Sequence, residues 1–273
     1  SNEAQTAFNN FEGVFKTKYN DVLRPYYDAL YKMNIGVDFI DPSVLDFSGY
    51  KLIVVPVLYA ASDDLLERLN VFVKNGGHVV YSFQSGSSNE YTKVRSTLQP
   101  GIINVACGIT YNQFTVPENV SLTDDPYKVG DENQIQTLME LIKPTTAKVL
   151  AYYDHPVWKD YAAVTENKYG KGLATYVGAM TTNRLLEEIL KDVVKKAGLW
   201  DVKQNLVFPI ITKDGINEEG KTIRYIMNYS DKAVEIKYPF GKGTELLTNQ
   251  KYNTNEQITL TPWSVKIVEI EGK

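Results

Sequence analysis

The sequence is poor in the residues from which most catalytic and metal sites are built. It contains one cysteine, Cys107, so it can form no internal disulfide, and only two histidines, His78 and His155. Neither histidine has a companion at metal-ligand spacing, and neither H-E-x-x-H nor C-x-x-C occurs. The sequence therefore predicts no metal site and no cofactor.

Long apolar runs and an excess of positive charge are also missing. No run approaches the roughly 18 apolar residues that span a bilayer. The net charge of −4 gives no electrostatic reason to expect a nucleic acid or an anionic membrane as partner. The chain opens SNEAQTAFNN, without a basic start or an apolar segment, which favours a cytoplasmic over an exported location.

What the sequence does contain is a globular composition with helices and strands that alternate. Its 273 residues suffice for about two domains. Residues 19–36 and 62–77 carry apolar side chains at helical spacing. VDFID (37–41), KLIVVPVL (51–58) and HVVYSF (78–83) read as strands, and strands that are apolar on both faces are typical of a parallel sheet covered by helices.

The pattern continues to about residue 200. Residues 131–144 predict a helix with Asp131 as its cap and Pro144 as its stop. A strand at 147–153, a hairpin at 162–180 and a helix at 182–198 follow. The fold class predicted is a doubly wound α/β sheet, although no apolar strand precedes Tyr19. Such a sheet resembles the flavodoxin-like and class I glutamine amidotransferase-like folds.

After Trp200 the periodicity changes to short, partly alternating apolar stretches separated by turns. No helical period appears there, so the sequence predicts a small antiparallel β-sandwich. We place the boundary near Asp201, which gives an α/β domain at 1–201 and a β-sandwich domain at 202–273.

Two glycine-containing stretches raise the question of an active site. Gly76-Gly77 follows a helix, whereas phosphate-binding glycines precede one, so this pair predicts a left-handed helix end. The loop QSGSSNE (84–90) lies at the carboxyl end of a strand, where α/β sheets bind ligands, which makes Ser85, Ser87 and Ser88 candidates. No nucleophile-elbow motif G-x-S-x-G is present, and we interpret the loop as solvated.

The remaining reactive residues also favour structural roles. His78 begins a strand directly after the glycine pair, which indicates a surface or edge position. Cys107 has no visible base or charge that would lower its pKa, so it is interpreted as a buried structural thiol. The acidic pairs 124–125 and 187–188 look solvated. We therefore predict no catalytic residue in this chain.

The segment YYDHPVWKDY (152–161) is unusually aromatic for a predicted loop. Its Tyr152, Tyr153, His155, Trp158 and Tyr161 are candidates for contact with a partner or a ligand. The alternative is that these rings cap the sheet or seat the C-terminal β domain, since aromatic anchors serve both roles. The sequence leaves both interpretations open.

Several phrases, taken in order, resemble one known family. They are YYDALYKMNIGVDFIDPSVLDFSGYKLIVVPVLYAASDDLLERLNVFVKNGGHVV, then AAVTENKYGKGLATYVG, then TIRYIMNYSDKAVEI and LTPWSVKIVEI. Together they resemble the trimerisation domain and the small C-terminal β domain of glycoside hydrolase family 42 β-galactosidases. The resemblance implies a homo-oligomer, a trimer in the parent enzyme. It also implies a galactoside as the parent's substrate and a role in shaping a neighbouring subunit's substrate cleft.

The same resemblance limits what this chain can do. In that family a (β/α)₈ barrel precedes this region and holds both catalytic glutamates. No segment here can be that barrel, so no catalytic residue carries over, and the barrel domain becomes an implied partner. The alternatives from other classes are a free-standing amidotransferase-like hydrolase that uses Cys107 or a serine, and a carbohydrate-binding module built on exposed rings such as Trp158.

Overall fold

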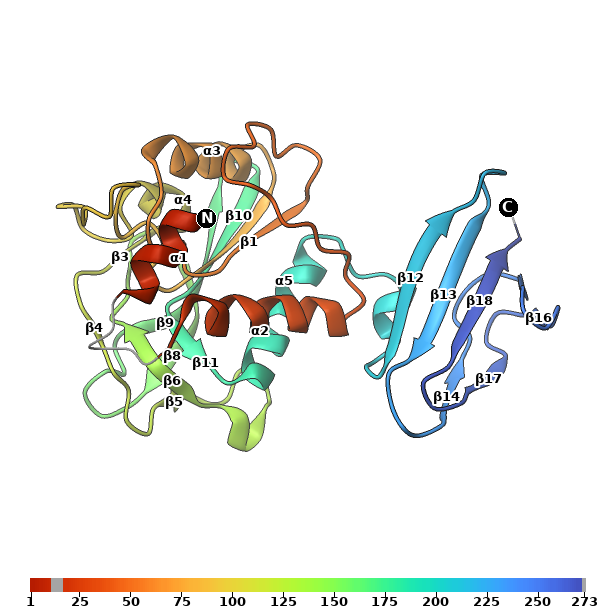
Figure 1. Ribbon diagram of the computed structural model, residues 1–273. Helices are drawn as coiled ribbons and strands as arrows, with labels where there is room; N and C mark the ends of the chain where they lie inside the picture. Colours follow the sequence, from red (N-terminus) through yellow and green to blue (C-terminus); the bar gives the residue numbers. More distant parts are fainter. Residues whose placement is uncertain (11–16, 272–273) are drawn as a thin grey trace. The chain divides into compact units, whose positions relative to one another are not determined.

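The structure, a computed structural model, describes residues 1–10 and 17–271 and divides the chain into two compact units (Figure 1). The N-terminal unit comprises Ser1–Tyr27 and Asp38–Gly198, and the C-terminal unit comprises Asp28–Val37 and Leu199–Lys273. The sequence analysis did not assign residues 28–37 to the C-terminal part. No helix in the described ranges is long and apolar enough to cross a bilayer.

The described residues form five α-helices, and some of them begin where the sequence offers a capping residue. The helices are α1 (Asn2–Asn9), α2 (Tyr19–Lys32), α3 (Asp63–Lys74), α4 (Asn104–Cys107) and α5 (Asn183–Lys196). The Ser62 hydroxyl caps α3 by accepting from Leu65 N, and Thr182 caps α5 in the same way. Both caps lie at the helix starts that the sequence predicts. Short 3₁₀ turns occupy η1 (Gly101–Ile103), η2 (Gly130–Glu132) and η3 (Val202–Asn205).

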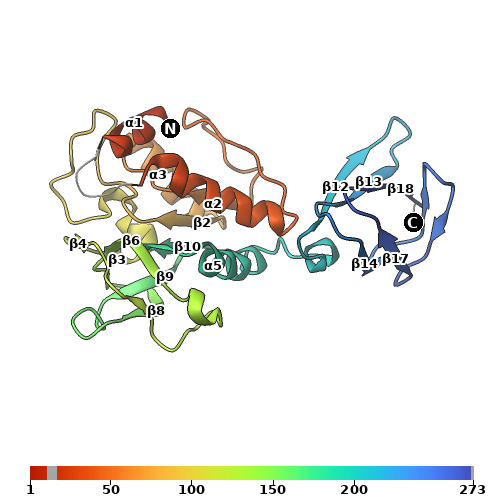
Figure 2. The same ribbon diagram turned by 60° about the horizontal axis from the view of Figure 1, so that its bottom comes forward.

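A six-stranded sheet forms the centre of the N-terminal unit (Figure 2). Its order is β1 (Leu52–Val55), β2 (His78–Ser82), β10 (Gly172–Val177), β9 (Ala162–Tyr169), β8 (Lys148–Asp154) and β5 (Ser121–Leu122). Strands β1, β2 and β10 run parallel, whereas β10, β9, β8 and β5 pair antiparallel. The hairpin predicted at 162–180 is confirmed as β9 and β10, joined at Tyr169–Gly172.

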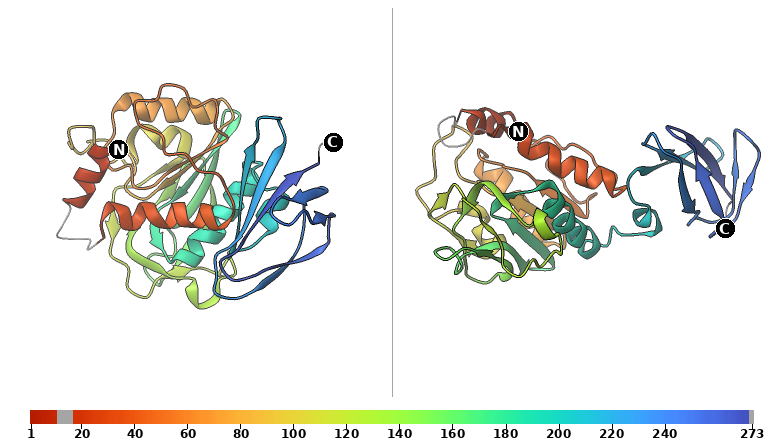
Figure 3. Two further views of the ribbon diagram at one scale, coloured as in Figure 1. Left: turned by 45° about the vertical axis from the view of Figure 1, so that its right-hand side comes forward. Right: turned by 90° about the horizontal axis from the view of Figure 1, so that it is seen from below.

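Helices cover both faces of this sheet. Asn167 of β9 donates its side-chain amide to the carbonyl of Ala106 in α4, at 2.8 Å. The adjacent residue, Glu166, points to the opposite face because side chains alternate along a strand, and it forms an ion pair with Lys196 of α5. Two views of this layering are given in Figure 3. The unit is therefore a mixed α/β structure with its core on both sides of the sheet.

A smaller sheet corrects one predicted helix. It contains β11 (Ala179–Thr181), β6 (Ile135–Glu140) and β4 (Phe114–Thr115), while β3 (Ile109–Thr110) pairs with β7 (Lys143–Pro144). The helix predicted at 131–144 is wrong, because residues 135–140 form strand β6 and residues 143–144 form strand β7. Thr137 has a φ of 52°, which breaks the strand's alternation. Ile135, Leu138 and Met139 are thereby all buried, and their spacing imitates a helix.

The strand predicted at 37–41 is also wrong. No strand forms there, and Phe39 is 72% exposed with its ring 5.6 Å from that of Tyr27. The Asp41 carboxylate accepts from the backbone N–H and the hydroxyl of Ser43, at 2.8 and 2.6 Å. This local turn competes with extended structure, as aspartate side chains commonly do.

The glycine pair after α3 serves the structural role that the sequence predicts. Gly76 has a φ of 120°, a region that side chains rarely adopt. A Cβ at Gly77 would lie 2.2 Å from a ring carbon of Phe72. The pair therefore lets the chain leave α3 and enter β2 beside a closely packed ring.

The C-terminal unit is antiparallel, as predicted. One sheet has the order β12 (Ile210–Ile216), β13 (Thr222–Asn228), β18 (Val265–Ile270), β15 (Gly243–Glu245) and β16 (Lys251–Tyr252). A second pairs β14 (Val234–Lys237) with β17 (Gln257–Leu260). Between them lies a core of buried apolar side chains: Leu206, Ile210, Ile226, Tyr238, Phe240, Tyr252, Ile258, Leu260 and Val268.

Asn34 ties residues 28–37 into this unit. Its side-chain amide donates to the carbonyls of Leu206 and Ile210, at 2.9 and 3.2 Å, and its amide oxygen accepts from Thr212 N at 2.7 Å. The side chain is 3% exposed, so water cannot replace these bonds. Its φ of 59° also suits asparagine, which tolerates the left-handed region.

We expect Asn34→Ala to destabilise the C-terminal unit by about 2 kcal/mol, because buried donors and acceptors lose their partners. Hydrogen exchange of the β12 amides measures this loss directly, and those of β2 serve as the internal reference. An exchange rate in β12 that matches the wild-type rate would contradict the role given to Asn34.

Candidate interaction surface

Several loops gather at one end of the central sheet. The parallel strands β1, β2 and β10 end at Val55, Ser82 and Val177. Val177 pairs with Ser82 and Val55 with the preceding Tyr81, so the three strand ends lie at the same edge of the sheet. Strand β9 runs the other way and begins at Ala162, so the residues before it return to the same end. The segments that follow β1, β2 and β10 therefore lie at the same end of the sheet as residues 155–161, the end at which α/β sheets present functional groups.

Residues 152–161, which we call the aromatic segment, contain a row of aromatic rings. The rings of His155 and Trp158 stack at 5.9 Å and 18°, and the ring of Tyr161 lies 6.4 Å beyond Trp158. Lys143 extends the row, with its Nζ 5.8 Å from the Tyr161 ring centroid. His155 Nδ1 accepts from Val157 N at 3.1 Å, which fixes the imidazole in the turn.

The five candidate residues of this segment separate into two groups. Tyr153 is fully buried, and its hydroxyl donates to the carbonyls of Glu140 and Gly178, at 3.0 and 3.2 Å. It therefore points away from any partner. Tyr152 is 42% exposed, and His155, Trp158 and Tyr161 are half-buried.

The strand predicted at 147–153 is confirmed as β8, which contains Tyr152 and Tyr153, and strand alternation turns one outward and the other inward. One feature of the segment differs from the sequence interpretation. Val157, which the sequence analysis did not single out, is 62% exposed beside the aromatic row. Its place after His155-Pro156, in a turn, is the sequence signal that could have identified it.

The loop after β2 is buried, so its interpretation as solvated is wrong. Ser85, Ser87 and Ser88 are at most 5% exposed. The cause is pairing with a distant stretch of backbone, since Gly86 N donates to Leu58 O and Ser88 N donates to Tyr59 O, both at 2.9 Å. The serine hydroxyls are thus part of a structural layer.

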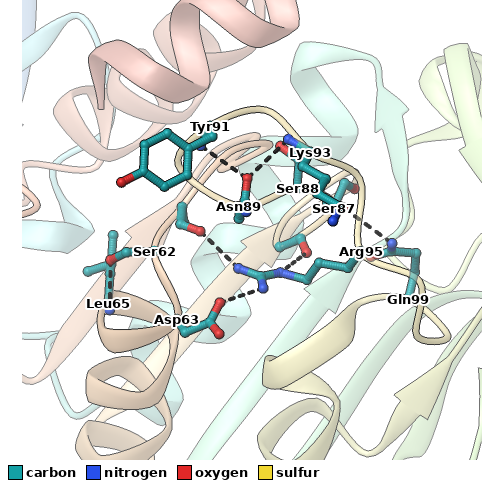
Figure 4. A network of polar contacts seen from close by, with 12 residues as sticks. Ser62, Asp63, Leu65, Ser87, Ser88, Asn89, Tyr91, Lys93, Arg95 and Gln99 are labelled. Atoms are coloured by element: carbon teal, nitrogen blue, oxygen red, sulfur yellow. Dashed lines mark hydrogen bonds and ion pairs between the residues drawn. The ribbon is translucent and has the colours of Figure 1, made fainter.

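Beyond this buried stretch the chain emerges as a loop held by Arg95 (Figure 4). We call residues 89–98 the pinned loop. The Arg95 guanidinium donates to the carbonyls of Gly86 and Ala61, at 3.2 and 2.9 Å, and forms an ion pair with Asp63. The Asn89 side chain accepts from the backbone N–H groups of Tyr91 and Lys93, each at 3.0 Å.

The pinned loop presents apolar side chains to solvent. Tyr91 is 80% exposed, Val94 58% and Leu98 56%. Exposed large apolar side chains that cluster on an ordered loop are typical of protein interaction sites.

A buried carboxyl, that of Glu140, binds the backbone at Gln84, in the buried stretch that precedes the pinned loop. Glu140 is fully buried and accepts from Gln84 N at 2.7 Å and from the Tyr176 hydroxyl at 3.0 Å. Burial raises the pKa of Glu140 to about 8, because the carboxylate loses its hydration. Gln84 has a φ of 58°, and Glu140 fixes its amide in that conformation. Sequence reasoning missed Glu140 because it placed this residue in a helix.

The other reactive residues are structural. His78 lies on the inner strand β2, 3% exposed, which corrects the surface or edge position expected for it. Its Nε2 lies 2.8 Å from the Thr175 hydroxyl, and burial lowers the pKa of His78 to about 4. Cys107 is buried, as predicted, and burial raises the pKa of its thiol. Within the described ranges no three His, Cys, Asp or Glu side chains gather closely enough to hold a metal ion.

Comparisons with known proteins match both parts of the chain to one kind of enzyme. Residues 1–200 match the family described as "Beta-galactosidase trimerisation domain", and residues 217–269 match "Beta-galactosidase C-terminal domain". Beta-galactosidase LacA of Lactobacillus acidophilus is 29% identical over 253 residues, 92% of this chain and 36% of that protein. Beta-galactosidase BgaB of Geobacillus sp. is 31% identical over 83% of this chain and 33% of its own length.

Solved structures agree. The crystal structure of a beta-galactosidase from Bacillus circulans sp. alkalophilus is similar with a TM-score of 0.80 and 26% identity, over 93% of this chain and 38% of that one. A GH42 beta-galactosidase, Gan42B, shares the fold with a TM-score of 0.81 over 97% of this chain and 38% of its own, at 23% identity. The chain thus spans little more than a third of the length of these proteins.

Proposed function

The chain belongs to the glycoside hydrolase family 42 β-galactosidases through their trimerisation and C-terminal domains, and we propose that it is the non-catalytic C-terminal portion of such an enzyme. Its work is self-association, as a trimer in the parent. The match of residues 1–200 to the trimerisation domain carries this proposal. Hydrolysis of a galactoside and the catalytic barrel belong to the longer parent protein.

The reactive groups of this chain support a non-catalytic role. A general acid or nucleophile must reach its substrate, and Glu140 is fully enclosed by the core. Cys107 has a raised pKa, whereas a nucleophilic cysteine needs a lowered one, which argues against the amidotransferase-like alternative. A carbohydrate-binding module is disfavoured because His155 and Trp158 stack on each other rather than side by side as a platform.

At the level of fold, we propose that the N-terminal unit is a doubly wound sheet of the flavodoxin-like or amidotransferase-like kind. The parallel strands β1, β2 and β10 and the helices on both sheet faces support this assignment. We likewise propose that the two units act as separate domains with a boundary near Asp201. We further propose that the exposed part of the aromatic segment contacts a neighbouring subunit and shapes its substrate cleft.

The proposal predicts a chain that associates but does not hydrolyse. Sedimentation velocity over a range of concentrations should show a three-chain species, and a chromogenic galactoside should give no turnover above a buffer blank. Turnover that survives repurification and disappears when one carboxylate of this chain is mutated would overturn the non-catalytic assignment. A single-chain species at every concentration would overturn self-association.

A further inference from the structure

Three copies of a chain around a threefold axis cannot meet through one self-complementary patch. A closed ring of three uses a head-to-tail contact, in which one surface of each copy meets a different surface of the next. A trimerisation unit must therefore present two distinct surfaces. The N-terminal unit has two loops with the required properties, the pinned loop and the aromatic segment.

Both loops are fixed before any partner arrives. The pinned loop is held by the three acceptors of Arg95 and by the Asn89 side chain. The aromatic segment is held by Lys159 N, which donates to His155 O at 3.1 Å, and by Tyr161 N, which donates to Trp158 O at 3.0 Å. Preformed loops lose little conformational entropy on association, so their exposed apolar area contributes more fully to binding.

Both loops also emerge from the same end of the central sheet. The pinned loop follows β2 and the aromatic segment precedes β9, and β2 and β9 are the two neighbours of β10. Two surfaces at one end of a unit can both approach a common symmetry axis.

We propose that the pinned loop of one copy contacts the aromatic segment of the next copy. Tyr91, Val94 and Leu98 supply the apolar side chains of the first surface, and Tyr152, Val157 and Trp158 supply those of the second. The inference rests on the proposed self-association and adds to it the two surfaces involved and their head-to-tail pairing.

Three exposed valines provide a matched test. Val94 lies on the pinned loop, Val157 on the aromatic segment, and Val71 on the solvent side of α3, with exposures of 58%, 62% and 52%. We expect Val94→Glu and Val157→Glu each to weaken self-association at least tenfold, because a carboxylate placed in an apolar contact loses its hydration. Val71→Glu should associate like the wild-type chain. Circular dichroism verifies that all three variants remain folded.

Mixing the two weakened variants separates head-to-tail pairing from other arrangements. The Val94→Glu chain retains an intact aromatic segment, and the Val157→Glu chain retains an intact pinned loop. One native contact can then form between them, so native mass spectrometry of a mixture with distinguishable tags should show a mixed two-chain species. Neither variant alone should show a two-chain species at the same concentration.

The outcomes separate this inference from the proposed function. A wild-type trimer with Val94→Glu or Val157→Glu equally trimeric overturns the inference and leaves self-association standing. Variants that weaken association but form no mixed species show that the two surfaces do not meet each other, which also overturns it. A wild-type chain that remains single at every concentration overturns the proposed function, and the inference with it.

Discussion

Replacing Glu140 with glutamine should remove a large pH dependence from the stability of the N-terminal unit. The pKa of Glu140 rises from an ordinary 4.5 to about 8 in the folded chain. A carboxyl whose pKa is raised by folding binds its proton more tightly in the folded state. Its stabilising contribution is therefore complete below pH 4.5 and is lost as the pH rises to 8.

The size of the effect follows from the shift. Each pKa unit corresponds to about 1.4 kcal/mol, so the free energy of unfolding should fall on the order of 4 kcal/mol between pH 4.5 and 8 from this group alone. Glutamine keeps an acceptor for Gln84 N and does not ionise. We expect Glu140→Gln to match the wild-type chain near pH 5 and to be more stable by that amount at pH 8.

The surroundings of Glu140 simplify the comparison. Tyr111, Tyr153 and Tyr176 lie around it, and burial raises the pKa of each well above its usual range, so they stay neutral between pH 5 and 8. His78 acts in the opposite sense, because its lowered pKa adds stability as the pH rises toward 6.5. That contribution is common to both chains and cancels in their difference.

Urea unfolding at pH 5 and pH 8 measures the difference. Glu118→Gln, which removes an exposed carboxylate, is the control and should follow the wild-type chain at both values. If the free energy of unfolding changed by the same amount between pH 5 and pH 8 in Glu140→Gln and in the wild-type chain, Glu140 would not hold a raised pKa.

Local signals explain which parts of the fold could be predicted from the sequence. The caps Ser62 and Thr182, the left-handed Gly76 and the hairpin turn at Tyr169–Gly172 each act within a few residues of their own position. Their structural meaning is therefore readable without knowledge of distant contacts. The order of the family phrases indicated the two domains that the comparisons then matched.

The failures have a common physical origin in contacts between distant residues. Strand β6 is stabilised by pairing with β4 and β11. The positive φ of Thr137 interrupts the alternation of buried and exposed side chains by which a strand is recognised in a sequence. The loop after β2 (residues 84–90) is buried against a distant stretch of chain, where residues 58 and 59 accept its backbone hydrogen bonds. His78 is interior because β10 pairs with β2 across some 95 residues of chain. None of these partners is visible from the local sequence.

The candidate site was predictable in part. The aromatic content of residues 152–161 identified a segment whose Tyr152, His155, Trp158 and Tyr161 reach the surface. The pinned loop could not be recognised from the sequence, because its fixed conformation depends on contacts of Arg95 with two carbonyls and with Asp63 in separate segments.

Replacing Arg95 with alanine should release the pinned loop. The guanidinium has three acceptors, and its side chain is only 12% exposed, so the carbonyls of Gly86 and Ala61 would lose charge-assisted bonds in a poorly hydrated place. We expect a loss of about 3 kcal/mol in the free energy of unfolding. Trypsin cleavage after the exposed Lys93 should accelerate at least tenfold, since the loop would open locally without global unfolding.

Two further variants separate the geometry of Arg95 from its charge. Arg95→Lys keeps a cation beside Asp63 but lacks the planar fork that reaches both carbonyls, so cleavage after Lys93 should still accelerate. Arg184→Ala removes an arginine whose ion pairs with Glu187 and Glu188 are 53% exposed on the arginine side, and it should cost less than about 1 kcal/mol. If Arg95→Ala were as resistant to trypsin as the wild-type chain, the loop would not depend on Arg95. In that case the preformed surface on which the pairing of copies relies would need another cause.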